Sequence, residues 1–507
     1  MTSKCFKQIA VIFSALCLVA CSGDDGVDGL NGTDGTNAAE QIVIATETLA
    51  PGETMTVAHD FANYSADLAF EYNGARWDHS EFGLVYNPAN DFESPFAVIG
   101  DPDSQADSFD EAVTFRSTSD GYAAYLIRES YDQISNVITD HALIEETMNR
   151  EGEVQAFEVL LRETEAGYLE NVFYIQAFET SSGVLTLLLA GNDNYIMTFV
   201  DNQLGEVLNV STLEDLNEQG VGWRFSQGYS SQQYAAMLDG GTIVACIAKP
   251  DLDVDSGVDS RMSLQSFSIA ADGSISLGNQ VVVSESPGQF EAEDCVVSSR
   301  PQGGVAAFFE REGDFYSEIW AGMYDANLES EMEAIVADNF MGRRTISCNT
   351  QDVCIAGYEQ GGPDLFNYAA FSLQGVLERA VLDDNEGDYL SSTALADDVF
   401  LLSTTEDDSL ASYLWVISPD GTQIQEPHLM SPFRAVDDDR RNTLLPATGN
   451  NARFFYNTYE SSNVSDYVSV TVSQNRLAEV REAGQYLVTN KSLHTVDVIV
   501  TLTGTTD

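Results

Sequence analysis

Val305-Ala-Ala-Phe-Phe-Glu310 begins the stretch of sequence that decides the fold. A short polar loop follows it, and then come the alternating run Ile319-Trp-Ala-Gly-Met-Tyr324 and the turn Asp325-Ala-Asn-Leu328. Short apolar or alternating runs that end in turns rich in Asp, Asn or Gly are typical of antiparallel strands. The stretch therefore predicts consecutive strands of one small sheet.

The same pattern recurs toward the C-terminus. Further copies begin at Val353, Val399 and Ala452, so that successive starts lie 48, 46 and 53 residues apart. An earlier copy begins at Ile243 and turns at Asp272-Gly273. A period of about 45–60 residues with four strands in each unit is typical of β-propeller blades. One blade cannot bury both of its faces, whereas a closed ring of blades covers them.

We therefore predict an all-β fold, a β-propeller of about seven four-stranded blades within residues 41–507. Six to eight blades fit the length, and tandem β-sandwich domains are the alternative. The tail 486–502 also alternates. It either closes the ring by pairing with an N-terminal strand such as 53–57, or belongs to a small sandwich.

The N-terminus carries a targeting signal. Lys4 and Lys7 precede an apolar run that starts near Ile9 and ends at Leu18-Val-Ala-Cys21. A charged start, a short apolar segment and small residues at the cut are typical of a secretory signal peptide, here residues 1–20. The run of about 12 residues is too short to span a bilayer.

The cysteine after the cut makes this segment resemble the lipobox of bacterial lipoproteins. The resemblance implies that Cys21 becomes the N-terminus, carries acyl chains and anchors the protein to a membrane. Ser22 follows where an Asp commonly retains lipoproteins at the inner membrane. We therefore expect the protein at the outer membrane of a Gram-negative cell. The sequence does not decide which face of that membrane it occupies. A plain signal peptide with a chance cysteine is the alternative.

Residues 21–40 contain glycine at every third position from Gly23 to Gly35. This period is that of collagen, but the run contains four Asp and lacks Pro. A flexible acidic stalk is therefore preferred over a short triple helix.

The chain is strongly acidic, with 22 Lys and Arg, 81 Asp and Glu, and a net charge of −59. Nucleic acid and anionic membranes would repel such a protein. A hydrophobic content of 44% with 10% aromatic residues is too high for a disordered chain. We expect a folded monomer with an acidic surface, for which divalent cations are natural small partners.

Four cysteines remain after Cys5, Cys17 and Cys21 are set aside. An even number in an exported protein favours disulfides. Cys348 and Cys354 flank a predicted tight turn, so we expect them to pair, which leaves Cys246 with Cys295. Four cysteines allow three pairings, and free buried thiols are the alternative.

One loop has the composition of a cation site. Asp251, Asp253, Asp255 and Asp259 occupy positions 1, 3, 5 and 9 of a segment that contains Gly257. Calcium prefers such oxygen-rich loops, and the segment resembles the calcium loops of integrin-type propellers. It departs from them by placing the glycine one position late, and it lacks the closing Glu of an EF-hand. A solvated acidic loop is the alternative. Two further acidic clusters, weaker candidates, are Asp101–Asp107 and Asp437–Asp439.

Signals of catalysis are scarce. Gly-x-Ser-x-Gly, P-loop and dinucleotide fingerprints are absent, and the histidines lack metalloprotease spacing. They are His59, His79, His141, His428 and His494. The tryptophans, of which Trp320 and Trp415 occupy equivalent repeat positions, fit packing between blades better than a sugar-stacking platform.

We therefore predict a lipid-anchored, non-catalytic binding or scaffold propeller that presents loops to a protein or glycan partner. The layout resembles propeller lipoproteins of the outer-membrane assembly machinery, although their repeated Ala-x-x-x-x-Gly-x-x-x-Trp turn is absent. Two alternatives are a calcium-stabilised structural surface protein and a polysaccharide-acting enzyme, since a glycosidase needs only two carboxylates.

The calcium hypothesis predicts that the melting temperature rises with calcium concentration, because a ligand of the native state stabilises it by mass action. The gain is about 2.7 kcal/mol at a hundredfold excess over Kd. Thermal unfolding of the wild type and of Asp253→Asn/Asp255→Asn, in calcium or in NaCl of equal ionic strength, checks this. Equal melting temperatures of the wild type in the two salts would contradict it.

Overall fold

The computed structural model describes most residues between 40 and 504. The described ranges are 40–49, 53–58, 67–72, 75–78, 84–86, 108–132, 137–150, 154–163, 167–191, 194–200, 207–216, 223–226, 233–238, 240–250, 260–286, 295–312, 317–338, 341–360, 365–383, 390–396, 398–405, 412–422, 424, 428–429, 443–447, 451–460, 464–474, 477–482, 485–490 and 496–504.

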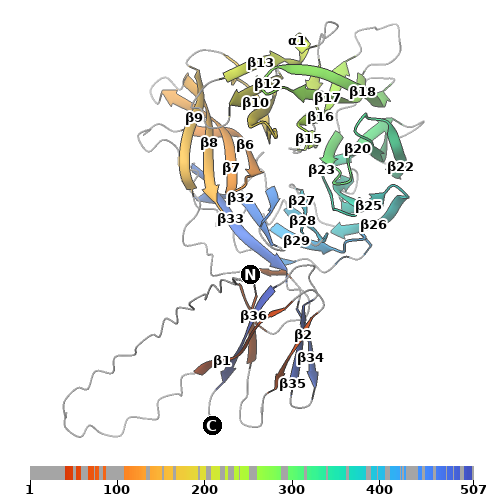
Figure 1. The fold of residues 1–507 in the computed structure, drawn as a ribbon. Helices are drawn as coiled ribbons and strands as arrows, with labels where there is room; N and C mark the ends of the chain where they lie inside the picture. The colour runs from red at the N-terminus through yellow and green to blue at the C-terminus, as the bar shows by residue number, and fades with distance from the viewer. Residues whose placement is uncertain are drawn as a thin grey trace, which may run out of the picture.

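Seven antiparallel sheets of the described chain follow one another around a ring (Figure 1). Blade 1 contains β6 (Ser108–Ser117), β7 (Gly121–Asp132), β8 (Val137–Asn149) and β9 (Val154–Glu163). Blade 2 contains β10 (Val172–Glu179), β11 (Val184–Gly191), β12 (Tyr195–Val200) and β13 (Val207–Thr212), and the short helix α1 (Leu213–Leu216) follows it. In blade 3, β14 (Arg224–Phe225) and β15 (Ala235–Leu238) both pair with β16 (Thr242–Pro250), which continues to β17 (Ser260–Ile269) and β18 (Ile275–Ser286).

The next three blades repeat the four-strand order. Blade 4 contains β19 (Cys295–Ser299), β20 (Val305–Glu312), β21 (Ser317–Tyr324) and β22 (Ser330–Asp338). Blade 5 contains β23 (Met341–Cys348), β24 (Cys354–Gln360), β25 (Leu365–Ser372) and β26 (Gly375–Asp383). Blade 6 contains β27 (Ser391–Ala394), β28 (Phe400–Thr405), β29 (Ser412–Ile417) and β30 (His428–Leu429). The predicted all-β propeller of seven blades is confirmed, and tandem β-sandwiches are not what forms the ring.

Blade 7 joins the two ends of the ring. It contains β31 (Thr443–Pro446), β32 (Asn451–Glu460), β33 (Val464–Gln474) and, as its outermost strand, β5 (Leu84–Tyr86). The register runs from Val472 opposite Tyr86 to Gln474 opposite Leu84. A strand from before blade 1 therefore completes the last blade.

Two further sheets of the described chain lie beside the ring, below it in Figure 1. One contains β1 (Glu40–Leu49), β36 (Val496–Gly504), β3 (Asp67–Tyr72) and β4 (Ala75–Asp78); the other contains β2 (Thr54–Ala58), β35 (Gln485–Asn490) and β34 (Leu477–Glu482). The tail thus pairs with the expected N-terminal strand, Thr54 opposite Thr489. This pairing builds a small separate unit instead of closing the ring, so residues 41–507 contain more than the propeller.

The core consists of side chains between adjacent blades. All residues of β11 are buried, and this strand packs on blade 1 through Leu187 and Leu189 against Tyr125 and Ile127. Burial of one such side chain stabilises the fold by about 1.5–3 kcal/mol. Trp223 and Trp415 also lie in buried clusters between blades, which agrees with the packing interpretation.

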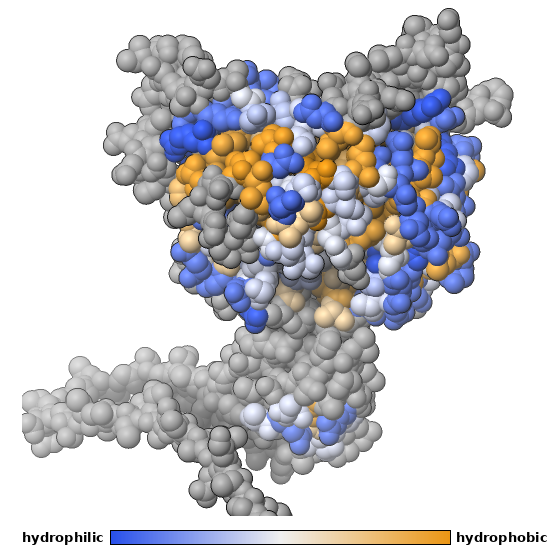
Figure 2. All heavy atoms as spheres, turned by 45° about the horizontal axis from the view of Figure 1, so that its top comes forward, coloured by the Kyte–Doolittle hydropathy of each residue, from blue (hydrophilic) through white to orange (hydrophobic). Residues whose placement is uncertain are grey.

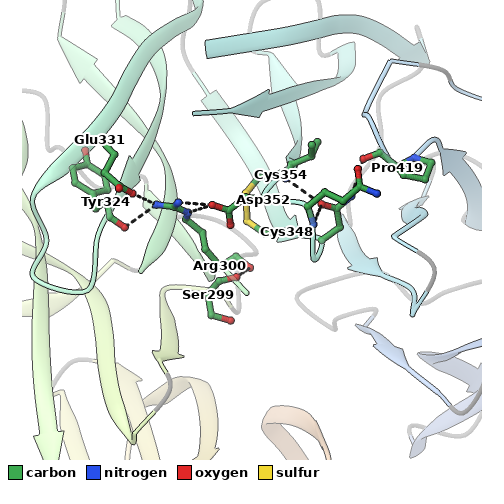
Figure 3. The surroundings of a disulfide bond; sticks show 12 residues. Ser299, Arg300, Tyr324, Glu331, Cys348, Asp352, Cys354 and Pro419 are labelled. Carbon is green, nitrogen blue, oxygen red and sulfur yellow. Dashed lines mark hydrogen bonds and ion pairs between the residues drawn. A yellow bond between two sulfur atoms is a disulfide. The ribbon is translucent and has the colours of Figure 1, made fainter. Parts of the chain in front are cut away.

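Turns between the first and second strands link blades 4, 5 and 6 on one face of the ring. Asp352 and Asp398 occupy the left-handed position of two such turns, with φ of 60° and 68°. Both are buried, and both carboxylates accept hydrogen bonds from a neighbouring turn: Asp352 pairs with Arg300, and Asp398 accepts from the Thr350 amide at 2.8 Å. Figure 3 shows the Arg300 side chain extended between Glu331 and Asp352.

Both expected disulfides are present. Cys246–Cys295 joins β16 of blade 3 to β19 of blade 4, whereas Cys348–Cys354 closes the hairpin between β23 and β24 (Figure 3). The first bond closes a sequence separation of 49 residues and the second one of 6. In the described part of the chain, no helix has the length and apolar character needed to cross a membrane.

The two disulfides differ in predicted contribution because a longer closed loop restricts the unfolded chain more. The chain-entropy relation gives about 4 kcal/mol for the first bond and about 2 kcal/mol for the second. We expect Cys246→Ala/Cys295→Ala to lower the free energy of unfolding more than Cys348→Ala/Cys354→Ala. Urea titration of both variants measures the two losses, and equal losses would contradict the dependence on loop length.

Candidate functional site

A cleft of about 1120 Å³ lies between blades 1 and 2, with one turn of blade 3 at its edge. Its walls come from the ends of β6, β8 and β10, the middle of β9 and the following turns. Gly240 and Gly241 form the edge from blade 3, with φ of 90° and 83°. A side chain at Gly241 would meet Thr180 at 3.2 Å. Glycine therefore permits this turn and keeps it close to the neighbouring blade.

Four carboxylate side chains from the described part of the chain line the cleft. Asp120 comes from the turn after β6, Glu145 from β8, Glu158 from β9 and Glu179 from the end of β10. Ser117, Thr118, Thr147, Asn149 and Gln155 add further polar groups, and Tyr122, Phe178, Phe199 and Met237 add apolar surface. The cleft combines hydrogen-bonding groups with apolar walls.

Arg116 holds two of these carboxylates in fixed positions. Its guanidinium forms an ion pair with Glu179 of blade 2 and donates a hydrogen bond to the Tyr125 hydroxyl at 2.9 Å. That hydroxyl donates to Glu145 Oε1 at 2.6 Å. Charge-assisted hydrogen bonds of this kind are roughly twice as strong as neutral ones. Glu145 and Glu179 are therefore connected through one partly buried relay.

Electrostatics keeps the relay in one protonation state. Burial and the adjacent Glu145 raise the pKa of Tyr125 well above its ordinary value. Burial lowers the pKa of Arg116, but Tyr125 and Glu179 raise it more, so the net change is upward. At neutral pH the tyrosine is thus a hydrogen-bond donor and the arginine a cation. Tyr125 is fully buried, which suits positioning and not attack on a ligand.

Blade 4 contains a second relay of the same kind. Tyr324 donates to Glu333 at 2.8 Å, and Arg311 donates to the same carboxylate at 2.9 Å while it lies 4.3 Å from the Trp320 ring centroid. None of these residues lines the cleft. The relay is therefore a stabilising device of this propeller, and its copy in blade 1 lies at the cleft.

A second cavity of about 270 Å³ lies among the first strands of the blades. Gln176 of blade 2 bridges to blade 3 by donating to the Ala235 carbonyl at 2.6 Å and accepting from the Ala235 amide at 2.9 Å. Gln233 accepts from the Ile346 amide of blade 5 at 2.7 Å and from the Thr345 hydroxyl at 2.9 Å. We call this cavity the channel. It shares Arg116, Ser117, Ala177 and Phe178 with the cleft.

The proposed calcium ligands Asp251, Asp253, Asp255 and Asp259, and the proposed lipid site Cys21, lie outside the described residues. The same holds for Asp101–Asp107 and Asp437–Asp439. Within the described residues, no group of three His, Cys, Asp or Glu side chains could hold a metal ion. Both hypotheses stay predictions.

Sequence reasoning missed the cleft. Arg116, Glu145, Glu158 and Glu179 come from the first two blades, whose repeats are irregular. Arg116 and Glu179 are 63 positions apart, and no periodic pattern connects them. The one available signal is compositional, because an arginine at the end of a predicted strand is uncommon in a chain with 22 basic residues.

The described surface is mixed in character. In the view of Figure 2, hydrophilic residues cover much of the ring, and hydrophobic residues reach the surface in a band between them. The exposed large hydrophobic residues of the described chain are Phe157, Tyr168, Phe173, Val282, Ile335, Leu373, Leu377 and Val381.

Comparisons with known proteins give similarity at the level of fold. No protein-family model matches the chain, and no curated protein matches it.

Several solved structures are similar to this chain. A polysaccharide lyase, Uly1, is 8% identical to it, with 82% of this chain and 99% of that chain covered and a TM-score of 0.42. The α-L-arabinofuranosidase Arb93A from Fusarium graminearum is 12% identical, with 60% and 93% covered and a TM-score of 0.37. The β-propeller domain of the Trilobed protease from Pyrococcus furiosus is 8% identical, with 72% and 96% covered and a TM-score of 0.37. Likenesses this distant transfer no activity, so function is argued from the cleft itself.

Proposed function

We propose that this protein is an exported, lipid-anchored binding protein whose propeller holds a neutral glycan in the cleft between blades 1 and 2. The observation that supports it best is the cleft of about 1120 Å³ with four carboxylates on its walls. Ligand pockets for drug-sized molecules span roughly 300–1,000 Å³, so this cleft suits an oligosaccharide of a few units.

The chemistry of the walls favours sugar hydroxyls. An ionised carboxylate only accepts hydrogen bonds, and hydroxyl groups donate them. Among the described residues of the lining, four carboxylates stand against one guanidinium, that of Arg116, which is already paired with Glu179. The cleft therefore has a negative field that repels acidic polymers. Phe178 and Met237, both partly exposed, offer apolar surface for the CH groups of a sugar ring.

Preorganisation supports binding by reducing its entropic cost. Ordering a flexible side chain at an interface costs about 0.5–1.5 kcal/mol. Glu145 is held by Tyr125, and Glu179 by Arg116, without any ligand. The two acceptors therefore meet a ligand in fixed positions.

The location of the binding protein is part of the proposal. The lipobox-like Leu18–Cys21 and the glycine-rich segment after it support an anchored propeller held away from the membrane by a stalk. The anchor would precede β1, so the small two-sheet unit would lie on the chain between membrane and ring. The calcium-stabilised structural role remains an alternative that the melting experiment addresses.

The glycan proposal predicts that neutral oligosaccharides bind and that Glu145→Gln and Glu158→Gln weaken binding. Loss of one charge-assisted hydrogen bond costs about 1.5–3 kcal/mol, or about tenfold to a hundredfold in Kd. Isothermal titration calorimetry with a panel of neutral gluco-, xylo- and manno-oligosaccharides, and with uronate oligomers for comparison, measures it.

Glu333→Gln is the matched control, since it alters the corresponding relay in blade 4 and leaves the cleft intact. Equal weakening by Glu333→Gln, or binding of uronate oligomers alone, would contradict the proposal. Chromatography of the titrated sugars gives the second readout: shortened products would identify the enzyme alternative.

The anchor predicts that Cys21→Ala abolishes incorporation of labelled palmitate and releases the protein from the membrane fraction. The reason is that Cys21 would supply the sulfur and the new N-terminus that carry the acyl chains. Labelling of cells that express wild type or Cys21→Ala, followed by fractionation, checks this, with Cys17→Ala as control. Palmitate label on the Cys21→Ala protein would exclude Cys21 as the acylated residue.

A further inference from the structure

We propose that the connection between blades 1 and 2 carries a second sugar-binding site, an aromatic platform for the apolar face of a neutral sugar ring. The platform consists of Tyr168, Glu170, Asn171 and Phe173. It lies at the start of β10, whereas the cleft residues Phe178 and Glu179 lie at the end of that strand. From Phe173 to Glu179 the strand spans about 20 Å. The platform is therefore distinct from the cleft and does not depend on it.

Two aromatic rings of the platform face solvent. Tyr168 is 44% exposed and Phe173 is 45% exposed, although burial of such side chains would stabilise the fold. The Tyr168 ring packs edge-on against Tyr195 of β12, with 5.2 Å between the ring centroids. The pairing of β10 with β11 shifts register between Val172 and Tyr174, so Phe173 is the extra residue of a β-bulge. A bulge re-aims a side chain and is common beside functional sites.

The backbone beneath the two rings is held in place without a ligand. Leu169 and Val172 are fully buried in the core cluster between blades 1 and 2. The Glu163 carboxylate at the end of β9 accepts hydrogen bonds from the Tyr168 amide at 3.2 Å and from the Leu169 amide at 3.0 Å. A side chain at Gly167 would meet this carboxyl group at 2.5 Å, so glycine permits the contact. Exposed aromatic residues on a rigid support bind at low entropic cost and are typical of binding surfaces.

Polar side chains lie between the two rings in the sequence. Glu170 and Asn171 are both exposed; a carboxylate accepts hydrogen bonds, and an amide both donates and accepts them. A sugar ring has CH groups on its faces and hydroxyl groups around its rim, so the aromatic rings suit its faces and the polar side chains its rim. The charge of Glu170 and the net charge of −59 disfavour uronates and nucleic acid. A neutral sugar is therefore the ligand that fits the platform.

The test is saturation-transfer difference NMR of the full mature chain with neutral gluco-, xylo-, manno- and galacto-oligosaccharides. Wild type is compared with Glu145→Gln/Glu158→Gln, in which the proposed cleft site is weakened. We expect at least one of the sugars to give signals with this double variant. The strongest signals should come from the C–H protons on one face of a ring, because that face would lie on the aromatic side chains. Titration of the signals gives Kd.

Further substitutions in the double variant locate the binding. Tyr168→Leu keeps an apolar side chain but removes the ring, so we expect Kd to rise about threefold to tenfold. Tyr168→Phe keeps the ring and should leave Kd unchanged. Phe173→Leu tests the second ring and should raise Kd to a similar extent. Val381→Ala is the matched control, because it alters a side chain of blade 5 that is 56% exposed and lies outside the platform.

Absence of signals from all the sugars with the double variant would overturn the platform proposal. Equal Kd values for Tyr168→Leu, Phe173→Leu and the unaltered double variant would overturn it as well, and would favour an apolar contact with a protein. The cleft proposal fails by a different result, in which Glu145→Gln/Glu158→Gln binds sugar as the wild type does and Tyr168→Leu abolishes all binding.

Discussion

Coverage of each blade by its neighbours is the constraint on which the rest of this structure depends. A strand such as β11, in which all residues are buried, is stable only if both faces of its sheet are covered. Each face is apolar, so removal of one blade would expose the faces of two others to water. The ring must therefore be complete, and the three residues of β5 that pair with β33 join its ends. The strands on either side of these three residues belong to the small two-sheet unit and to blade 1.

Closure of the ring also creates its polar features. The first strands of the blades converge at the centre, where their backbone groups are removed from water and need partners. Gln176 and Gln233 supply some of these partners with side-chain amides that reach other blades, Gln176 from blade 2 to blade 3 and Gln233 from blade 3 to blade 5. On the turn face, Asp398 accepts from the Thr350 backbone amide and Asp352 pairs with the Arg300 guanidinium, so both carboxylates link neighbouring turns. Such contacts link the blades to one another, and the cleft lies beside the Arg116–Glu179 ion pair, which joins the end of β6 to the end of β10.

The repeat was predictable because it is local. The alternation in Val305–Tyr324 and the spacing of its copies depend on one blade at a time, and they predicted the blades. The number of blades came from the chain length, which fits six to eight. The hairpin disulfide Cys348–Cys354 was predictable for the same reason. By contrast, β5 has three residues and no periodicity, so its place in blade 7 follows only from the closed ring. Arg116, Glu145 and Glu179 likewise meet through blade-to-blade packing, which no local pattern encodes.

The distribution of charge gives the interior arginines a particular meaning. With a net charge of −59, the protein has little need of cations for solubility, and the acidic surface is well hydrated. Arg116, Arg300, Arg344 and Arg453 are nevertheless buried or nearly so. Burying a guanidinium costs free energy unless it is paired or hydrogen-bonded. Where the contact is to an acid of a neighbouring blade or turn, as for Arg116 and Arg300, the pair holds the ring together. Arg344 shows a further kind of contact, because its Nη1 donates a hydrogen bond to the Gly342 carbonyl of the same strand.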